Sequence, residues 1–347
     1  MLLSFHFGIL INMIEPSYVS LAQYSSLRIG AEGLFIEVSH EEELLDALQY
    51  AQKASLKPYI IGSGTNTFFG ESLNGFLFIH PALKEVAYNT KGDDVYVTAG
   101  AGEMWDNLVK EVTEKGLWGI ENLSYIPGTV GAAPVQNIGA YGVSLSDVFV
   151  SLRAIDCTTY EIVTLDRESC QFGYRDSLFK QERGRYVVIS VTLHCYSLVR
   201  PVLTYRPLDA LVTYKNMTPT VVRGLVIATR KSKLPEYKEY PNCGSFFKNP
   251  VVLRAQGEAL RTQYPDLPLI EEGNNYKIPA AWLIEHIAKM KGVRVGDVGT
   301  WLTQPLVIVN YGQATAEEVL SFAGSIVERV KKETGIALEF EVNYVSG

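Results

Sequence analysis

The feature that most constrains the fold is an uncharged, glycine-rich run over residues 125–142, which reads YIPGTVGAAPVQNIGAYG. The stretch without charge is longer still, from Asn122 to Ser146. An exposed loop of this length normally carries charge, because connecting segments run over the surface. Glycines let a backbone adopt positive φ or approach a ligand closely, and successive N–H groups in such turns form concave sites for phosphate oxygens. The run therefore predicts a cradle for a large, phosphate-bearing cofactor, with a tightly packed structural loop as the alternative.

The composition argues against several classes of protein. With 347 residues, the chain is long enough for two or three domains. It has 31 Lys and Arg against 38 Asp and Glu, a formal net charge of -7, so a nucleic-acid partner is not expected. An anionic ligand would instead need a local cluster of Arg and Lys. The four cysteines and five histidines show neither C-x-x-C nor H-E-x-x-H spacing, which indicates a reduced cytosolic protein without a metal site or a disulfide framework.

The beginning of the chain is interpreted separately. Residues 1–14 are mostly apolar but lack the basic segment and the small-residue cleavage site of a signal peptide. The run is also shorter than the roughly 20 residues that a membrane-spanning helix needs, so no membrane association is expected. Met13 is a candidate for the true start, and residues 1–17 are interpreted as a tail or a mis-assigned start.

A second glycine turn follows a short apolar stretch. Residues 58–61 predict a strand that runs directly into the turn formed by Gly62, Ser63, Gly64, Thr65 and Asn66. A Rossmann dinucleotide site requires an amphipathic helix after such a turn, whereas here the sequence FFG follows at 68–70, so that site is not expected. No G-K-S/T tripeptide occurs in the chain, which excludes a P-loop.

Helices and strands are both predicted, and the fold class is α+β. Apolar residues at helical spacing, with caps at their ends, predict helices over 39–51, 105–116, 279–292 and 315–335. The first and last of these begin with capping boxes, formed by Ser39 with Glu42 and by Thr315 with Glu318. Apolar runs and alternation predict strands over 58–61, 94–99, 306–309 and 336–342, and further short strands between 147 and 198. Residues 230–250 are rich in Lys and Pro and indicate a domain boundary.

Three polar residues stand out as candidates for chemistry. Arg175, in the segment FGYRDS at 172–177, offers a planar fork for a carboxylate or a phosphate, although composition alone favours a surface ion pair with Asp176. Ser245 lies in the segment GSFFKNP, which has no histidine to activate it as a nucleophile. A hydroxyl that donates a proton is therefore favoured over a Ser-His-Asp hydrolase, with a turn before a strand as the alternative. Glu341 lies on a predicted strand near the C-terminus, and a solvent-facing carboxylate is its alternative.

Seven segments in this order resemble the family of UDP-N-acetylenolpyruvoylglucosamine reductase, also called UDP-N-acetylmuramate dehydrogenase. The segments are GSGTN at 62–66, IPGTVG at 126–131, PVQNIGAYG at 134–142, FGYRDS at 172–177, KLP at 233–235, GSFFKNP at 244–250 and LEFEV at 338–342. The resemblance covers nearly the whole chain, from Tyr18 to Val342. Residues 201–205 are similar to the tyrosine-bearing loop of the long, type I form.

The resemblance implies a three-domain flavoprotein that combines an FAD-binding fold of the vanillyl-alcohol-oxidase/PCMH type with a C-terminal substrate-binding α+β domain. The implied divisions are a first FAD-binding subdomain at 18–82 completed by 336–347, a second at 83–229, and the substrate-binding domain at 230–335. No feature of the sequence sets the oligomeric state, and a monomer is the working expectation.

The resemblance also implies an NADPH-dependent reduction of a nucleotide sugar through FAD, in the cytoplasmic synthesis of peptidoglycan precursors. Arg175 would neutralise the substrate carboxylate, Ser245 would supply a proton and Glu341 would polarise the same region. The implied FAD-binding residues are Gly62, Ser63, Gly64, Thr65, Asn66, Gly128, Thr129, Gly131, Asn137 and Ala140, with Arg230 near the flavin or the substrate. The implied contacts to the substrate are Tyr205, Lys233, Asn249 and Gln304, and no metal is implied.

Two other functions are weighed against this one. A flavin oxidase of the same cofactor fold often tethers its flavin through His or Cys, and the cradle contains neither. A nucleotide-sugar-binding protein that has lost its flavin would not need the intact glycine turns. The chain also departs from the family pattern, with Trp301 where many relatives have His and Asn343 where type I relatives often have Arg. Residues 264–277 offer no match for a second substrate-contacting tyrosine.

Overall fold

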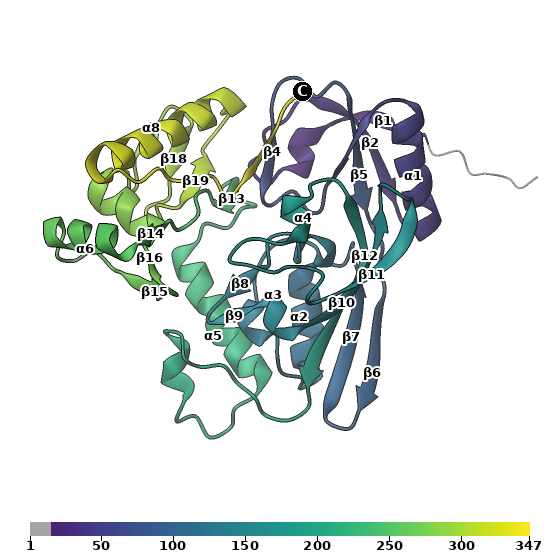
Figure 1. Cartoon of the computed structure of the whole chain (residues 1–347), viewed down its shortest axis with the longest axis horizontal. Coiled ribbons are helices and arrows are strands. Elements are labelled where there is room, and N and C mark those ends of the chain that lie inside the picture. Colours follow the sequence, from purple (N-terminus) through teal and green to yellow (C-terminus); the bar gives the residue numbers. More distant parts are fainter. Residues whose placement is uncertain (1–14) are drawn as a thin grey trace, which may run out of the picture.

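The computed structural model describes residues 15–347, and the predicted tail or mis-start lies mostly outside this range. The first lobe is a four-stranded sheet covered by helix α1 (Glu41–Lys53), whose apolar face is buried (Figure 1). Its strands lie in the order β1 (Ser17–Ser20), β2 (Glu32–Val38), β5 (Phe76–Pro81) and β3 (Lys57–Ile60). The last three strands run parallel. Strand β3 ends at Ile60, and the predicted glycine turn at 62–66 follows it almost at once.

The second lobe is a five-stranded antiparallel sheet against which helix α2 (Trp105–Glu114) packs. Its strands lie in the order β11 (Glu161–Asp166), β10 (Phe149–Asp156), β12 (Tyr186–Tyr196), β7 (Asp94–Gly100) and β6 (Val86–Lys91). One hydrophobic core spans this sheet, α2 and the parallel sheet of the first lobe. Shorter elements of this lobe are β8 (Gly139–Ala140), β9 (Val143–Ser144), α3 (Leu145–Val148) and α4 (Leu178–Gln181).

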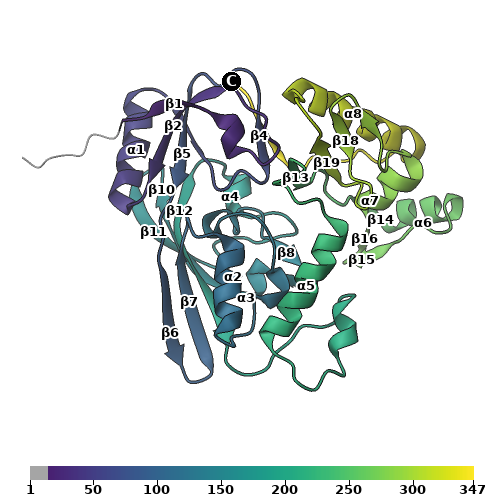
Figure 2. The same cartoon turned by 180° about the vertical axis from the view of Figure 1, so that it is seen from behind.

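The third lobe lies to one side of the other two and is reached through helix α5 (Pro219–Lys233) (Figure 2). One of its sheets has the order β13 (Asn242–Ser245), β19 (Val307–Asn310), β18 (Val298–Thr300) and β17 (Arg294–Val295). The other has the order β14 (Val251–Leu253), β16 (Asn275–Lys277) and β15 (Ile270–Glu272). Its helices are α6 (Arg254–Gln263), α7 (Ala280–Trp282) and α8 (Ala316–Thr334). Its core includes Leu27, Ile29 and Phe68, so the first lobe packs directly against it.

The chain returns to the first lobe at its C-terminal end. Strand β20 (Asn343–Val345) pairs in parallel with β4 (Thr67–Phe69), which directly follows the glycine turn. Both views show this end beside β4 (Figures 1 and 2). Within residues 15–347, none of the helices combines the length and the apolar character that crossing a bilayer requires.

The predicted elements are largely confirmed, with three corrections. The N-cap of helix α1 is His40 rather than the predicted Ser39, and the Glu43 carboxylate accepts the backbone N–H groups of both residues. The helix predicted over 279–292 is a short α-helical turn followed by a π-helical turn at Leu283–Ile287. The strand predicted over 336–342 is wrong: Phe340 forms only an isolated bridge with Phe247, and the strand is confined to β20. Helix α5 was not predicted.

Candidate active site

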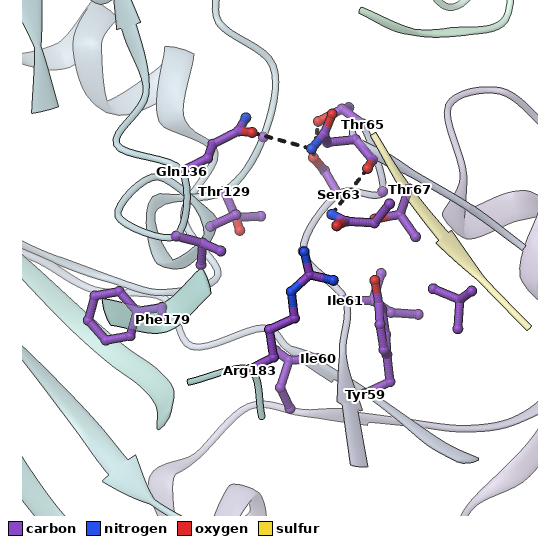
Figure 3. Close-up of a pocket in the computed structure, with 18 of the residues that line it drawn as sticks. Tyr59, Ile60, Ile61, Ser63, Thr65, Thr67, Thr129, Gln136, Phe179 and Arg183 are labelled. Carbon is purple, nitrogen blue, oxygen red and sulfur yellow. Dashed lines mark hydrogen bonds between the residues drawn. The ribbon is translucent and has the colours of Figure 1, made fainter. Parts of the chain in front are cut away.

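A cavity of about 470 Å³ lies where the glycine turn of the first lobe faces the cradle of the second (Figure 3). This volume is in the range of small-molecule and cofactor sites. Four stretches line it: residues 57–67, residues 127–138, residues 179–187 and residues 343–346. Seven of the residues predicted to bind the cofactor take part in the lining, namely Gly62, Ser63, Gly64, Thr65, Asn66, Gly128 and Thr129.

The glycine turn is shaped by close backbone packing. Gly64 has a φ of +66°, and a Cβ there would lie 1.8 Å from the carbonyl oxygen of Tyr24. A Cβ on Gly62 would lie 2.8 Å from Oγ1 of Thr129, at the junction of the two glycine-rich loops. A side chain at Gly62 would thus intrude between the two loops, whereas one at Gly64 would clash with the backbone at Tyr24, so both positions require glycine for this close packing.

The charge of the cavity fits an anionic ligand. Its lining includes the cations Lys57, Lys180 and Arg183 and contains no Asp or Glu. The chain as a whole has a formal net charge of -7, so the cavity is a local exception of the kind that an anionic cofactor needs. Glycine-rich backbone, hydroxyls on Ser63, Thr65 and Thr129, and local positive charge together suit the diphosphate of a dinucleotide such as FAD.

Asn66 connects the glycine turn to the C-terminal segment. Its Nδ2 donates hydrogen bonds to the carbonyl oxygen of Glu341 at 3.1 Å and to Oε1 of Gln136 at 3.3 Å. Its own carbonyl oxygen accepts the backbone N–H of Asn343 at 2.9 Å. Asn66, which lines the cavity, is therefore hydrogen-bonded to the segment that bears Glu341, although Glu341 itself is not part of the lining.

Arg175 and Glu341 form an ion pair near this wall. Nε of Arg175 lies 3.3 Å from Oε1 of Glu341, and the two side chains are 24% and 12% exposed. Burial raises the pKa of Glu341 above its ordinary value, while the charges of Arg175, Lys180 and Lys248 oppose that shift. Within residues 15–347 Arg175 pairs with Glu341 and forms no ion pair with Asp176, which accepts a hydrogen bond from Gln181. The predicted catalytic arginine and glutamate are thus in direct contact.

Asn137 and Gly139 of the cradle hold the Arg175 guanidinium through their carbonyl oxygens, at 3.3 and 2.9 Å. The Asn137 side chain also donates to the carbonyl oxygen of Gly173, two residues before Arg175. Lys180 donates to the carbonyl oxygen of Arg175 itself at 3.0 Å. Asn137 therefore positions the arginine loop, and neither Asn137 nor its neighbour Ala140 lines the cavity.

Ser245 lies at the end of β13 and is exposed. The carbonyl oxygen of the next residue, Phe246, accepts the backbone N–H of Glu341 at 2.9 Å. This hydrogen bond places Ser245 on the segment adjacent to Glu341, although the two residues are far apart in the sequence. The structure thus brings Arg175 and Glu341 into contact and places the backbone of Ser245 on the adjacent segment, whereas none of the three residues belongs to the lining of the cavity.

Two other predicted cofactor residues lie behind the cavity. Gly131 packs its backbone on Ala101, where a Cβ would lie 2.6 Å from the alanine Cβ, and it does not line the cavity. Arg230 donates from Nε to the carbonyl oxygen of Tyr125 at 3.1 Å. Burial lowers the pKa of Arg230, and the like charge of Arg175 acts in the same direction. Arg230 is therefore anchored at Tyr125, the first residue of the cradle.

Of the four predicted substrate contacts, Lys233, Asn249 and Gln304 lie on or beside the third lobe, and Tyr205 lies beside the cradle. Tyr205 is 56% exposed and packs edge-on against Tyr141 of the cradle. Asn249 donates to the Tyr174 hydroxyl at 3.2 Å and so links the third lobe to the arginine loop. The carbonyl oxygen of Lys233 accepts a hydrogen bond from the hydroxyl of Thr303, the residue before Gln304, at 2.7 Å. Lys233 and Gln304 are thereby brought near each other.

Sequence reasoning missed Lys180 and Arg183, the two cations that follow the arginine loop. Both residues follow the segment FGYRDS at 172–177 by a few positions. That position alone does not predict that their side chains line a cavity. Trp301 and Asn343, the two residues that depart from the family pattern, have different surroundings. Trp301 packs against Tyr240, whereas Asn343 lines the cavity.

Comparisons with known proteins identify the family. The family model described as FAD binding domain matches residues 33–166, and the one described as UDP-N-acetylenolpyruvoylglucosamine reductase, C-terminal domain, matches residues 235–345. The UDP-N-acetylenolpyruvoylglucosamine reductase of Pseudomonas aeruginosa is 40% identical over 331 residues, which cover 94% of this chain and 97% of that one. The chain belongs to the UDP-N-acetylenolpyruvoylglucosamine reductase family. The reductase of Amoebophilus asiaticus is 39% identical and covers 94% of this chain and 98% of its own.

The solved structures agree with this family. The crystal structure of UDP-N-acetylenolpyruvylglucosamine reductase from Thermus caldophilus superposes with a TM-score of 0.67 at 25% identity, over 96% of this chain and 99% of that one. The predicted family, the α+β FAD-binding fold and the flavoprotein oxidoreductase class are therefore confirmed. The glycine-lined, carboxylate-free cavity described above is compatible with the FAD that this family uses.

Proposed function

We propose that this protein catalyses the NADPH-dependent reduction of UDP-N-acetylglucosamine enolpyruvate to UDP-N-acetylmuramate through FAD, as a cytoplasmic step of peptidoglycan precursor synthesis. The observation that carries the proposal is the Arg175–Glu341 pair at 3.3 Å, held beside a cofactor cavity in a chain of the reductase family. FAD, when bound, accepts a hydride from NADPH and passes it to the enolpyruvyl group.

Arg175 would bind the carboxylate of the enolpyruvyl group. Its guanidinium is already oriented by the carbonyl oxygens of Asn137 and Gly139, so little reorganisation is needed when negative charge develops on the substrate. The planar fork can contact both carboxylate oxygens, which a lysine cannot do. Arg175 would therefore act by stabilising the enolate-like charge.

Ser245 would donate a proton to C2 of the substrate. The hydroxyl is exposed at the end of β13, next to the segment that bonds to Glu341. Exposure leaves it free to contact a substrate that enters from the boundary with the third lobe. The proton lost to the substrate would be replaced from solvent.

Glu341 would polarise the same region from the opposite side of Arg175. A carboxylate next to the substrate carboxylate would normally repel it. Its raised pKa, caused by burial, and its pairing with Arg175 both reduce that repulsion. Glu341 would therefore act as part of the pair with the arginine.

The remaining residues would bind the two ligands. Gly62, Ser63, Gly64, Thr65, Asn66, Gly128 and Thr129 would contact FAD from the cavity wall, and Gly131, Asn137, Ala140 and Arg230 would support the site from behind. Tyr205, Lys233, Asn249 and Gln304 would bind the uridine diphosphate sugar at the boundary with the third lobe. A monomer remains the proposed catalytic unit.

The proposed domains divide into two that bind FAD and one that binds the sugar. Residues 18–82 with 336–347 and residues 83–229 would hold FAD between them, and residues 230–335 would close over the sugar. The pairing of β20 with β4 supports the assignment of the C-terminal segment to the first lobe. Helix α5 extends to Lys233, so the substrate domain would begin within its last turn.

An anaerobic stopped-flow experiment tests the function. Purified protein should be yellow, lose its flavin absorbance on mixing with NADPH, and regain it when the enolpyruvyl nucleotide sugar is added. Reoxidation by oxygen with no response to the sugar would instead indicate an oxidase. A colourless protein that FAD cannot reconstitute would contradict the proposal and indicate a sugar-binding protein.

A further inference from the structure

Arg183 lies in the loop between α4 and β12 and lines the cofactor cavity. Figure 3 shows its side chain extending into the cavity, toward the side that bears Ser63 and Thr67. Tyr59, Ser63 and Arg183 all belong to the lining of this cavity. Arg183 has no role in the catalytic arrangement proposed above.

The guanidinium of Arg183 is not engaged by a carboxylate within residues 15–347. Its one hydrogen bond is a long one, from Nε to the carbonyl oxygen of Lys180 at 3.4 Å. Arg185, two residues later, is different: it forms ion pairs with Asp156 at 3.1 Å and with Glu182. Two arginines of the same loop thus differ in whether an acid neutralises them.

The other two cations of the cavity are lysines with different surroundings. Lys180 donates to the carbonyl oxygen of Arg175 at 3.0 Å, and burial lowers its pKa. Lys57 lies over the ring of Phe76, with Nζ 5.6 Å from the ring centre. Arg183 and Lys57 are both exposed, but only Arg183 offers a planar guanidinium, which is suited to contact two phosphate oxygens at once.

We propose that Arg183 binds the diphosphate of FAD, opposite the glycine turn at residues 62–66. The proposal rests on FAD being the cofactor of the cavity. The backbone and hydroxyls of the turn contact the diphosphate from one side, and the guanidinium contacts it from the other. Arg183 is thus a cofactor-binding residue that the glycine motifs do not reveal.

Flavin affinity of the full chain tests the assignment, after the flavin has been removed and then restored. For Arg183→Gln, we expect the dissociation constant for FAD to rise about tenfold at low ionic strength, which is modest for a charged hydrogen bond because the side chain is exposed. Arg183→Lys should lose less affinity for FAD than Arg183→Gln, since lysine keeps the positive charge. The difference between parent and Arg183→Gln should shrink at high salt, because screening weakens an exposed ionic contact.

Three comparisons make the test specific. Riboflavin, which has no phosphate, should bind the parent and Arg183→Gln equally, whereas FMN, which has one, should also bind the variant more weakly. Arg185→Gln is the matched control and should keep the parent affinity for FAD. The melting temperature of the flavin-free Arg183→Gln protein should match that of the parent.

The outcomes separate the two proposals. If the parent binds no FAD, the proposed function fails and this assignment fails with it. If the parent binds FAD and Arg183→Gln binds it within twofold of the parent, only this assignment is overturned. Equal losses for riboflavin and FAD, or a loss for FAD with none for FMN, would also overturn it, since they would indicate contact with the ring system or stacking on adenine.

Discussion

Arg175 has a backbone conformation that few non-glycine residues adopt, with a φ of +50°. Such strain persists where the surroundings hold it in place, and it is found most often at functional sites. Here Lys180 bonds to the carbonyl oxygen of Arg175, and two cradle carbonyls hold the guanidinium. The strained backbone of Arg175 therefore occurs at the residue whose guanidinium is held in one orientation.

Ser245→Ala should separate the two half-reactions. Removing the hydroxyl should leave the reduction of flavin by NADPH nearly unchanged, because no proton is delivered to the sugar in that step. Reoxidation by the enolpyruvyl sugar should slow by at least about 100-fold, the low end for a positioned acid. Single-turnover absorbance traces measure both rates, and equal slowing of both would mean that Ser245 has a structural role.

Gly64→Ala should destabilise the protein through the close approach at Tyr24. The residue combines a φ of +66° with a Cβ position only 1.8 Å from a carbonyl oxygen. We expect a loss of about 3 kcal/mol or more in the free energy of unfolding. Gly75→Ala is the matched control, because Gly75 has a φ of +84° but no atom within 4 Å of its Cβ position.

For Gly75→Ala, the left-handed conformation alone should cost about 1–2 kcal/mol. Urea unfolding of the two variants therefore isolates the effect of the contact with Tyr24. Equal losses in both variants would show that the turn can shift to accept a side chain.

At the scale of elements, a partly buried ion pair joins α2 to α5. The Asp106 carboxylate accepts two hydrogen bonds from Arg223, and it also accepts the backbone N–H of Tyr125 at the start of the cradle. Burial alone would raise the pKa of Asp106, but Arg223 and the Tyr125 N–H outweigh it, so the pKa is lowered. The pair thus fixes the entrance to the cradle relative to the helix that leads to the third lobe.

Asp106→Asn should cost about 2 kcal/mol of unfolding free energy at neutral pH, because the pair is only partly exposed. Since the folded pKa lies below the ordinary value of 3.8, the contribution is full above that pH and is lost as the pH falls through the folded pKa. Denaturation curves of parent and variant should therefore converge in acid. A constant difference down to the acid limit would contradict the assigned charge effect.

At the scale of the whole molecule, the first lobe is completed by the far end of the chain. Removing residues 343–347 should lower FAD affinity at least about tenfold and cost about 2–3 kcal/mol of stability. Stability should fall because the truncation removes the pairing of β20 with β4 and the buried side chain of Val345. Affinity for FAD should fall because residues 343–346 form part of the cavity wall. Gel filtration shows flavin retention and thermal melting shows stability, with removal of Gly347 alone as the control. Full retention of flavin would show that the strand is dispensable.

The sequence predicted the cofactor cavity better than the path of the chain around it. Glycine spacing located both loops of the cavity, because close backbone approach leaves only that residue type. Alternation at 336–342 reported burial correctly for Ile336, Leu338 and Val342, but burial does not require a paired strand. Helix α5 was missed because Val221, Val222 and Gly224 disfavour a helix, and packing of Val222 and Val226 overrides that preference.

The charged residues of the site were only partly predictable. Arg175, Ser245 and Glu341 were found through family segments, and their assigned roles stay predictions, as do the domain boundaries. Arg183 and Lys180 were missed because their importance depends on which wall of the cavity they line, and that follows from tertiary structure alone.

The return of the chain to β4 has a consequence for biosynthesis. A polypeptide emerges from the ribosome with its N-terminal part first. The glycine turn is made early, yet Glu341, Asn343 and the strand that closes the wall beside it are made more than 270 residues later. A nascent chain can therefore fold its first sheet before the cavity wall at residues 343–346 exists, and Arg175 can pair with Glu341 only after that last segment has been made.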